Sequence, residues 1–415
     1  MSSTMKILVL NCGSSSIKYA LYNMDDKSVI TSGGIEKIGL PDSFIKIKTA
    51  DGSKVKIERE IPEHTSGVQF IFECLTQGEH AVLGSLEEID AVGHRMVHGG
   101  EKFNKSVILT DEVMEAFAEC NDLAPLHNPA NIKGVNAVKA SLPNVPQVGV
   151  FDTAFHQTMP DYAYMYALPY QLYKQYGVRR YGFHGTSHRY VSQRVTEFLS
   201  ERLEMGDERR EMRDEGLRII TCHIGNGASI AAIKNGKCID TSMGLTPLEG
   251  LIMGTRSGDI DAGAVTFLMD KLHLDTEGIS KLLNKQSGLA GVSEASSDFR
   301  DILASIQAGN DKARLAKEMY TYRIKKYIGQ YAAAMGGVDV IVFTGGAGEN
   351  QWEVREGATN GLEFLGVKVN KEKNHCVRAT EEIISEPDSK VTVCVIPTDE
   401  ELMIATDTLS LVGQQ

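Results

Sequence analysis

The fold is decided by the stretch Ile7-Leu-Val-Leu-Asn-Cys-Gly-Ser-Ser-Ser-Ile-Lys-Tyr-Ala-Leu21, because its pattern returns as Ile219-Ile-Thr-Cys-His-Ile-Gly-Asn-Gly-Ala-Ser-Ile-Ala-Ala-Ile233. Both stretches consist of an apolar strand, a small polar turn with glycine, and a second apolar strand. Glycine has no Cβ, so the N–H groups of such a turn can approach an anion closely. The two hairpins therefore predict a duplicated domain with a phosphate held between the halves.

A third glycine-rich turn, Gly345-Gly-Ala-Gly-Glu-Asn350, follows the predicted strand Val338–Phe343. Three turns of this kind at strand ends predict an enzyme that handles nucleotides. Strand and helix patterns alternate along the chain, which is typical of the α/β class. The clearest helix is Asp311–Met335, where apolar residues recur at near-helical spacing and Gly336-Gly337 ends the pattern.

The remaining elements follow from shorter patterns. We expect strands and turns at Ser28–Ile38 and Phe44–Ile61, strands at Asp90–Val97, Gln147–Phe151 and Val391–Ile396, and helices at Gly67–Thr76, 111–121, 129–140 and 186–216. The charge-dense part from Glu201 to Arg218 is interpreted as a solvated helix face or surface loop. The chain has no Pro- or Ser-rich linker, so the two halves are expected to meet across a hinge.

The bulk composition argues against two classes of partner. The 415 residues carry a net charge of −12, whereas nucleic acid and anionic membranes favour basic surfaces. The seven cysteines form no C-x-x-C pair, which favours reduced thiols in a cytoplasmic protein. The apolar run Ile7–Leu10 is too short for the core of a signal peptide, and no stretch reaches the length of a membrane span.

Charged and polar residues of the first half stand at the ends of predicted strands. In Asn11–Lys18, Asn11 offers an oxygen to a metal and Lys18 can neutralise a phosphate, although Gly and Ser also form ordinary hairpin turns. Arg95 precedes the Gly99-Gly100 turn and offers planar recognition of a carboxylate or phosphate. Asp152 directly follows an apolar strand, a position that lines ligand clefts in α/β folds.

Two histidines near Arg95 are four residues apart, His94 and His98. This spacing places side chains on one face only in a helix, so a metal pair in the predicted strand is disfavoured. Near the C-terminus, Glu400 or Asp399 is a candidate Mg²⁺ ligand after the strand Val391–Ile396, and an acidic helix N-terminus is the alternative.

The second half offers histidine and arginine in glycine-rich surroundings. His184 lies between Gly182 and Gly185, while His188 is better explained as a packed helix residue. The stretch Thr241–Asp261 is punctuated by glycine and nearly uncharged until Arg256. Such a segment fits a buried wall of an active site that carries one cation.

These motifs together resemble the acetate kinase family. The matching stretches occur in the family's order: Asn11–Lys18, His94–Gly100, Ala124–Ala130, Phe151–Pro160, Arg180–His188, His223–Gly227, Thr241–Asp261, Ser297–Arg300, Gly345–Asn350 and Pro397–Leu402. The resemblance implies an α/β fold of two ribonuclease-H-like (actin-like) domains around a nucleotide cleft, with duplicated βββαβαβα-type cores. It implies an N-terminal domain of residues 1–155 plus about 398–415 with the carboxylate and metal residues, and a C-terminal ATP-binding domain of residues 156–397. It also implies a homodimer.

The resemblance carries the family's functional residues onto this chain. Asn11 and Glu400 would hold Mg²⁺, for which Mn²⁺ could substitute, and Arg95 would bind the carboxylate substrate. Asp152, His184 and Arg256 would be catalytic. The apolar pocket for the substrate methyl would be Val97, Leu126, Phe183 and Pro247. ATP would be bound by Lys18, His223, Ile224, Gly225, Asn226, Gly227, Asp298, Phe299, Arg300, Gly346, Ala347, Gly348, Glu349 and Asn350. The chain departs from the family in the extra charges near 200–216, and in Asp399, where Asn is common.

The implied reaction converts ATP and acetate into ADP and acetyl phosphate, reversibly. Cations must offset the repulsion between a carboxylate and the γ-phosphate, a need that Arg95, Arg256, Mg²⁺ and His184 fit. The nucleophile is already ionised at neutral pH, so a general base is unnecessary in this direction. We therefore favour Asp152 as a ligand of Mg²⁺ or of its water, although the family position is commonly called an acid/base.

Three alternatives stay open on the sequence alone. One methylene in an apolar pocket is worth only about 1–3 kcal/mol, so a propionate or butyrate kinase is the nearest. The bulky Phe183 and the complete His94–Gly100 motif favour acetate. An ATP-driven conformational machine of the Hsp70 or actin type would leave Arg95 unexplained. A pyrophosphate- or phosphate-linked enzyme would leave the Gly346–Asn350 turn unexplained.

Overall fold

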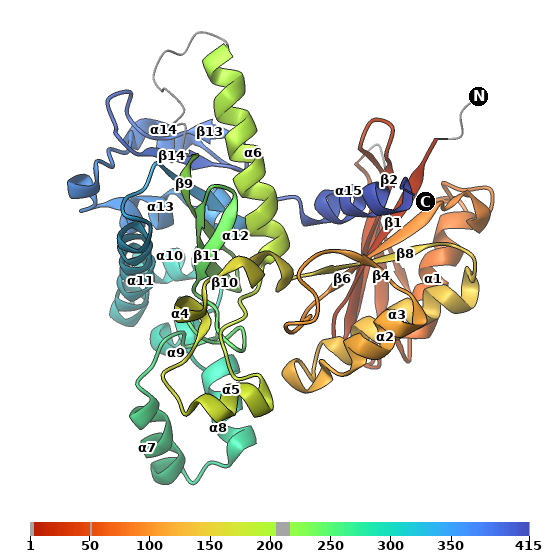
Figure 1. Cartoon of the computed structure of the whole chain (residues 1–415), viewed down its shortest axis with the longest axis horizontal. Coiled ribbons are helices and arrows are strands. Elements are labelled where there is room, and N and C mark those ends of the chain that lie inside the picture. Colours follow the sequence, from red (N-terminus) through yellow and green to blue (C-terminus); the bar gives the residue numbers. More distant parts are fainter. Residues whose placement is uncertain (1–3, 50–51, 205–215, 415) are drawn as a thin grey trace. The chain divides into compact units, whose positions relative to one another are not determined.

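The computed structural model describes residues 4–49, 52–204 and 216–414. The chain forms two compact units (Figure 1). Unit 1 consists of Met1–Phe155 and Asp399–Gln415, and unit 2 consists of His156–Thr398. Each unit is built on its own sheet, with eight strands in unit 1 and six in unit 2 among the described residues.

Unit 1 places its helices on both faces of a mixed sheet with the order β5-β4-β3-β2-β1-β6-β8-β7. Its elements are β1 Lys6–Cys12, β2 Ser16–Asn23, β3 Ser28–Glu36, β4 Phe44–Lys48, β5 Lys54–Glu58, α1 His64–Thr76, η1 Leu86–Glu88, β6 Ala91–Met96, β7 Val107–Ile108, α2 Asp111–Ala118, η2 Asn121–Leu123, α3 Asn128–Ser141, β8 Gln147–Phe151 and α15 Glu400–Val412. The short helix η3, Ala154–Thr158, begins in unit 1 and ends in unit 2.

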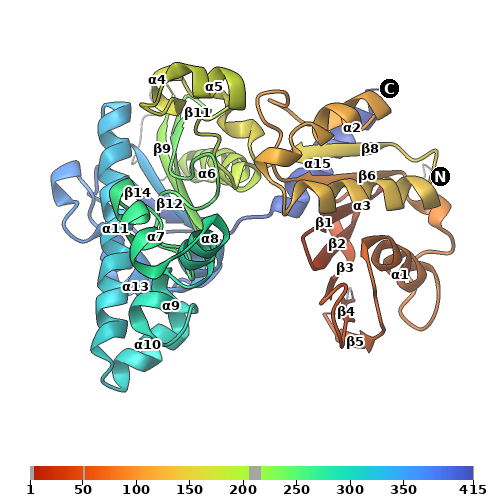
Figure 2. The same ribbon diagram turned by 90° about the horizontal axis from the view of Figure 1, so that it is seen from below.

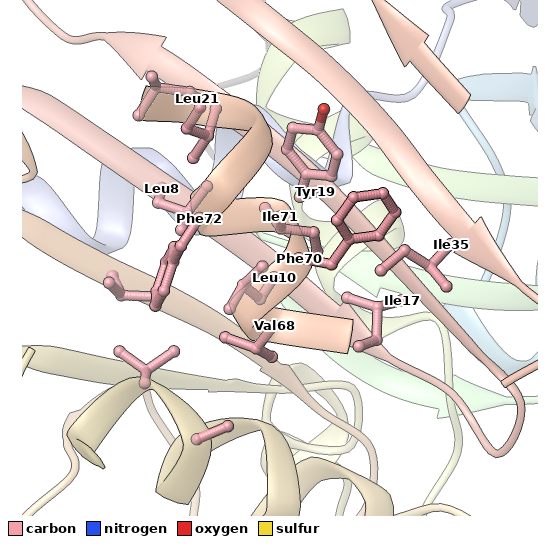
Figure 3. Close-up of a cluster of buried hydrophobic side chains, with 14 of the residues drawn as sticks. Leu8, Leu10, Ile17, Tyr19, Leu21, Ile35, Val68, Phe70, Ile71 and Phe72 are labelled. Atoms are coloured by element: carbon pink, nitrogen blue, oxygen red, sulfur yellow. The ribbon is translucent and has the colours of Figure 1, made fainter. Parts of the chain in front are cut away.

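The central strand β1 is apolar from Ile7 to Leu10, where both of its faces are covered. Successive side chains of a strand point to opposite faces. Leu8 and Leu10 belong to the core cluster with α1 and α3 (Figure 3), whereas Ile7 and Val9 belong to the cluster with α15. Each of these four side chains is at most 1% exposed, which stabilises the fold by about 1.5–3 kcal/mol per residue. The C-terminal helix α15 thus covers one face of the sheet that contains the N-terminal strand β1, as Figures 1 and 2 both show.

One glycine allows this helix to pack closely. A Cβ at Gly93 of β6 would lie 2.5 Å from Thr408 Oγ1 and 2.7 Å from Ile404 Cγ2, both on α15. A side chain at position 93 would therefore push α15 away from the sheet. Because Glu400 is the first residue of α15, Gly93 also fixes where this carboxylate lies relative to β6.

Unit 2 surrounds the sheet β11-β10-β9-β12-β14-β13 with helices. Its elements are α4 Asp161–Tyr164, α5 Tyr170–Tyr176, α6 Gly185–Glu204, β9 Arg218–Ile224, β10 Ala228–Lys234, β11 Lys237–Thr241, α7 Ala262–Leu272, α8 Thr276–Lys285, α9 Gly288–Ser293, α10 Phe299–Gln307, α11 Asp311–Met335, β12 Val340–Thr344, α12 Gly345–Asn350, α13 Trp352–Thr359, η4 Glu363–Leu365, α14 Lys371–Cys376, β13 Glu382–Ile383 and β14 Thr392–Val395. Helix α11 has the predicted bounds.

The two sheets share one topology, which confirms the duplication predicted from the hairpins. In unit 1, the meander β3-β2-β1 continues through parallel pairing to β6 and then β8. In unit 2, the meander β11-β10-β9 continues in the same way to β12 and then β14. Each quoted hairpin therefore supplies the first two strands of an equivalent core, and the predicted α/β class is confirmed.

Some predicted boundaries are wrong. The expected turn Gly345–Asn350 is the helix α12, whereas the strands and turns expected at Phe44–Ile61 are found as β4 and β5 with the segments around them. The predicted helix 186–216 is described as α6 to Glu204, and the rest of the charged 200–216 segment, up to residue 215, lies outside the described residues. Among the helices in the described part of the chain, none combines the length and hydropathy that crossing a membrane requires.

Candidate active site

The polar centre of unit 1 is an ion pair between Arg95 on β6 and Asp152 at the end of β8. Arg95 Nε donates to Asp152 Oδ1 at 2.9 Å, and Nη2 donates to Oδ2 at 2.7 Å. The side chain of Asp152 is 3% exposed and that of Arg95 is 25% exposed. The charge of Asp152 raises the pKa of Arg95 further above its ordinary value, so the guanidinium stays charged.

This pairing orients Arg95 without using all of its donors. Nη1 also approaches Asn11 Oδ1 at 3.4 Å. A guanidinium has five N–H groups, so two of them donate to no group in the described part of unit 1. The sequence predicted Arg95 as an anion-binding residue but did not predict that Asp152 accepts from it.

The other residues of unit 1 that were predicted for the site lie near this pair. Asn11 of β1 is the register partner of Lys18 on β2, an exposed lysine. Burial raises the pKa of Glu400 above the ordinary carboxyl value, and the positive charge of Arg95 offsets part of that rise. Asp399 caps α15 by accepting the N–H of Leu402 at 2.9 Å, so it has the helix-capping role that the sequence left as the alternative.

The donor atoms near Arg95 suit Mg²⁺. The described residues contain no group of three or more His, Cys, Asp and Glu side chains that could hold a metal ion. Asn11, Asp152 and Glu400 nevertheless supply one amide and two carboxylate oxygens, and the charges of Arg95 and Asp152 act on Glu400. Mg²⁺ is commonly bound by one or two carboxylates together with substrate phosphates. These residues therefore fit a Mg²⁺ that completes its coordination with a phosphate.

The segment after Arg95 is fixed by two asparagines that the sequence did not single out. Asn131 Oδ1 accepts from the N–H of Val97 at 3.0 Å, and Asn131 Nδ2 donates to the carbonyl of Cys12 at 2.9 Å. Asn128 Oδ1 accepts from the N–H of His98 at 3.1 Å. Helix α3 thereby ties the end of β6 to the first hairpin. The pattern offers one clue, since Asn128 falls within the stretch Ala124–Ala130.

The predicted apolar residues of unit 1 differ in exposure. Val97 is 7% exposed. Leu126, in the turn before α3, is 70% exposed, which is high for an apolar side chain. The exposed side chain of Leu126 is available to contact a ligand. Of the two histidines of this region, His94 bonds Gln147 Oε1 through Nε2 at 2.7 Å, and burial lowers the pKa of His94 to about 4.

In unit 2, His184 holds an unusual backbone conformation at the start of α6. Its φ is +56°, in the left-handed region that a branched or bulky residue rarely adopts without compensation. Its ring stacks on His223 with centroids 4.3 Å apart, and Nδ1 bonds Ser229 Oγ at 2.9 Å. The strained backbone therefore presents an imidazole that two strands, β9 and β10, hold in place.

A second histidine stands behind His184 and is neutral. Ser229 Oγ also bonds His188 Nε2 at 2.8 Å, and His188 Nδ1 bonds Thr221 Oγ1 at 2.6 Å. Burial lowers the pKa of His188 well below the ordinary histidine value, and His156 and His223 lower it further. His188 is thus a packed helix residue, as predicted, and it is linked to His184 through Ser229.

Arg256 is a half-buried cation, and the structure gives it no carboxylate partner within the described residues. Its Nη1 donates to the carbonyl of Pro247 at 3.2 Å and approaches Met253 Sδ at 3.7 Å. Burial lowers its pKa below the ordinary arginine value. A Cβ at Gly227 would lie 3.5 Å from Arg256 Nη1 and 3.6 Å from the ring of His184. The glycine turn between β9 and β10 therefore brings these two predicted catalytic residues to the same place.

Beside this turn lies a cavity of about 480 Å³. Eight predicted ATP-binding residues line it: Gly225, Asn226, Asp298, Phe299, Arg300, Gly346, Ala347 and Asn350. Five further lining residues were not among the predicted ones: Gly254, Leu289, Ser297, Tyr320 and Gln351. The rings of Tyr320 and Phe299, with centroids 5.5 Å apart, give one part of the wall an aromatic surface. The volume and mixed lining suit a nucleotide-sized ligand.

Other predicted ATP-binding residues do not line this cavity. His223 instead bonds Ser187 through Nδ1, at 2.7 Å. The carboxylate of Glu349 accepts from the N–H of Gly345 at 2.8 Å and from the N–H of Thr398 at 3.1 Å. Glu349 thus closes the first turn of α12 from within. Its carboxylate therefore accepts from backbone N–H groups.

Gly254 shows why the wall needs a residue without a side chain. A Cβ there would lie 2.0 Å from Asn226 Oδ1 and 3.1 Å from the carbonyl oxygen of Ser297. The N–H of Gly254 also donates to the carbonyl of Asn226 at 3.0 Å. Two wall segments meet at this glycine, so any substitution must displace Asn226.

The chain is closely similar to known proteins along its whole length. A sequence model described as the Acetokinase family matches residues 6–406. The chain is 68% identical over 410 residues to the acetate kinase of Bacteroides fragilis, covering 99% of this chain and 100% of that protein. It is 57% identical to Porphyromonas gingivalis acetate kinase, whose crystal structure matches with a TM-score of 0.93 over 98% of this chain and 100% of that one. A propionate kinase from Francisella tularensis is 40% identical, with a TM-score of 0.88 over 98% and 100% of the two chains.

Proposed function

The chain belongs to the acetokinase family, and from this premise we propose that it transfers the γ-phosphoryl group of ATP to acetate, reversibly, giving ADP and acetyl phosphate. The observation that carries the proposal is the 68% identity with an acetate kinase over 99% of the chain. The propionate kinase is less similar, at 40% identity, which supports acetate over the longer acids. The substrate methyl is assigned to Val97, Leu126, Phe183 and Pro247.

Arg95 binds the substrate carboxylate. Its ion pair with Asp152 fixes the plane of the guanidinium, and two N–H groups remain to donate to acetate. Parallel donation from arginine to a carboxylate gives direction as well as energy. Orientation of the nucleophile before reaction is one of the larger contributions that an enzyme can make to rate.

The cavity of unit 2 binds the nucleotide. The glycine turn of β9 and β10 and the helix α12 line it, and Phe299 and Tyr320 supply aromatic surface for an apolar part of the ligand. Lys18, His223, Ile224, Gly227, Gly348 and Glu349 complete the proposed ATP-binding set. Unit 2 is thereby proposed as the ATP-binding domain, and unit 1 as the domain with the carboxylate and metal residues.

Phosphoryl transfer then follows from the charges. An oxygen of ionised acetate attacks the γ-phosphorus, and the bond to the bridging oxygen of ADP breaks, with its electron pair leaving on ADP. Arg256 and His184 are placed side by side at Gly227 and donate to the phosphoryl oxygens as their charge spreads. Because Arg256 forms no ion pair with a described residue, its charge is available to the transferred group.

Asn11 and Glu400 are proposed to hold Mg²⁺, with Asp152 acting on it directly or through a water molecule. When bound, the ion neutralises phosphate charge. The high pKa of Glu400 fits this role, because a nearby dication favours the ionised carboxylate that burial disfavours.

We also propose a homodimer. Support comes from the exposed apolar side chains of unit 2, which include Tyr162 at 86% and Phe267 at 59% exposure. Single exposed apolar residues are ordinary, but several on α4, α5 and α7 are expected to be covered in an assembly. Sedimentation of the full chain at several concentrations tests this proposal. The cytoplasmic location stays a prediction from the sequence.

A coupled kinase assay with hydroxylamine trapping tests the reaction. Purified protein with ATP and Mg²⁺ should form hydroxamate best from acetate, less from propionate and least from butyrate. Arg95→Ala should abolish it at ordinary acetate concentrations. Hydroxamate formed best from propionate would keep the reaction type and change the substrate. ATP hydrolysis without hydroxamate from any of the three acids would refute the proposal.

A further inference from the structure

Arg355 is a fully buried arginine that no part of the proposed reaction uses. It lies on α13, its exposure is 0%, and it forms no ion pair with a described residue. All five of its N–H groups are accounted for by neutral oxygens. Nε donates to Asn374 Oδ1 at 2.7 Å, Nη1 donates to the carbonyls of Gly348 and Glu349, both at 2.9 Å, and Nη2 donates to the carbonyls of Asn374 and Val377 at 2.8 and 3.0 Å.

These acceptors belong to the ends of two helices. Gly348 and Glu349 are in the last turn of α12, and Asn374 and Val377 are at the end of α14. The last carbonyls of a helix lack intrahelical partners and carry partial negative charge. One guanidinium therefore satisfies the ends of both helices and fixes α12 relative to α14.

Helix α12 is also the wall of the nucleotide cavity. Gly346, Ala347 and Asn350 line the cavity, whereas Gly348 and Glu349 contribute carbonyls to Arg355. The other end of the helix is closed from within by the carboxylate of Glu349, which accepts the N–H of Gly345. The helix has six residues, too few to hold its position by its own hydrogen bonds. Its position depends on packing against β9 and on the groups that bind it, among them Arg355 at its C-terminal end.

Burying an arginine costs free energy that is not needed if the side chain only fills space. Burial and, to a smaller extent, the nearby cation Arg378 lower the pKa of Arg355 to about 10. A protein is often as stable, or more stable, when packed apolar side chains of similar volume replace buried charged groups. What an apolar side chain cannot do is donate five hydrogen bonds in a fixed plane. The five planar donors of Arg355 therefore explain how this residue can orient α12.

We propose that Arg355 is a positioning residue for the nucleotide: by binding the carbonyls of Gly348 and Glu349, it holds the cavity-lining residues of α12 where they contact ATP and ADP. This inference rests on the proposed nucleotide site of unit 2. Arg355 itself does not line the cavity and touches no reacting atom.

The test uses the full chain and Arg355→Lys, which keeps a cation but has three donors instead of five. We expect the Kd for ADP, measured by isothermal titration calorimetry, to rise by at least about tenfold, as the loss of one charge-assisted hydrogen bond predicts. The KM for ATP should rise by a similar factor, while the KM for acetate stays within about twofold. Loss of packing alone would lower the melting temperature without separating the two KM values.

Arg218→Lys is the matched control. Arg218 is a partly buried arginine of unit 2 that also donates to a helix-end carbonyl, that of Gly336, at 2.7 Å, and it is not among the cavity-lining residues. It should lower the melting temperature and leave the Kd for ADP unchanged. If Arg355→Lys does not fold, Asn374→Ala removes the acceptor of Nε and the bond that Asn374 Nδ2 donates to the carbonyl of Trp352, keeps the other four bonds of Arg355, and should raise the Kd by a smaller factor.

The outcomes separate the two proposals. A wild-type chain that binds neither ADP nor ATP would refute the nucleotide site itself. A wild-type chain that binds ADP, with Arg355→Lys or Asn374→Ala binding it equally well, would overturn the positioning role and leave the nucleotide site standing. A parallel rise of the KM for acetate in Arg355→Lys would also overturn it, because the effect would then not be confined to the nucleotide.

Discussion

Replacing Asp152 by asparagine separates three roles for this carboxylate. It is an acid or base, a ligand of Mg²⁺ or its water, or the group that orients Arg95. The structure adds the third role, because both carboxylate oxygens accept from Arg95, at 2.9 and 2.7 Å. Asparagine is nearly the same size but has one acceptor oxygen where aspartate has two, and it carries no charge.

The size of the effect follows from this geometry. Asp152→Asn leaves at least one N–H of Arg95 facing an amide NH₂ group, and the side chain of Arg95 is only 25% exposed, so water replaces the lost partner incompletely. A hydrogen bond between charged groups is worth about 1.5–3 kcal/mol. If that orientation is fully used in the transition state, kcat/KM for acetate falls by about 10- to 150-fold. Kd for ADP should stay unchanged.

The assay is hydroxamate formation at saturating ATP, with acetate, pH and Mg²⁺ varied in turn. If Asp152 orients Arg95, neither higher Mg²⁺ nor a change of pH restores activity. Recovery at high Mg²⁺ would assign the residue to the metal, and recovery at a shifted pH would assign it to proton transfer. Asp339→Asn is the matched control, because Asp339 accepts from Arg218 Nε and Nη2 at 3.0 and 2.9 Å in unit 2. A kcat/KM for acetate within twofold of wild type in Asp152→Asn would refute the orienting role.

Three further predictions use the same preparations. Arg256→Ala should lower kcat by about 10³ or more with little change in the KM for ATP, and a change confined to that KM would contradict the transition-state role. Gly254→Ala must displace Asn226, whose Oδ1 would lie 2.0 Å from the new Cβ, so calorimetry should find the Kd for ADP raised at least about fivefold; equal binding would show that the wall adapts. Burial lowers the pKa of His94 from 6.5 to about 4, so the unfolded chain protonates this residue at pH values where the folded chain does not. The free energy of unfolding should therefore fall by up to about 3 kcal/mol between pH 6.5 and 4 on account of His94, and thermal unfolding of His94→Gln should lack that part of the slope.

Sequence patterns were sufficient where structure repeats at short range. The alternation in Ile7–Leu21 and Ile219–Ile233 specifies hairpins, and a third meander strand and two parallel strands after each complete the recurring sheet core. The long helix Asp311–Met335 could be read because its periodic pattern ends at Gly336, whose φ of +71° is the left-handed conformation expected of a helix end. In each case the residues that determine the element are neighbours in the chain.

The prediction of a turn at Gly345–Asn350 is wrong because residues distant in the chain determine this element. Four of the first five residues are glycine or alanine, so the local pattern does not distinguish a tight turn from a short helix. The helix is determined by Glu349, which binds the N–H of Gly345, and by Arg355, whose partner Asn374 is nineteen residues further on. Tyr320 was missed in the same way, because nothing near it in the sequence indicates that α11 borders the cavity.

The duplicated cores use equivalent hairpins for different chemistry. In unit 1, the hairpin contributes side chains: Asn11 contacts Arg95, and Lys18 acts on Glu400 through its charge. In unit 2, Gly225 and Asn226 line a cavity, and Gly227 leaves room for the two side chains proposed as catalytic, His184 and Arg256. A site of ionised groups suits a small carboxylate and a metal, whereas a glycine-rich wall suits a nucleotide that needs close backbone approach. The two halves therefore differ at the turns and strand ends while their strand order is the same. The strands alone predict the duplication, whereas the roles proposed for the two units depend on the residues that follow the strands.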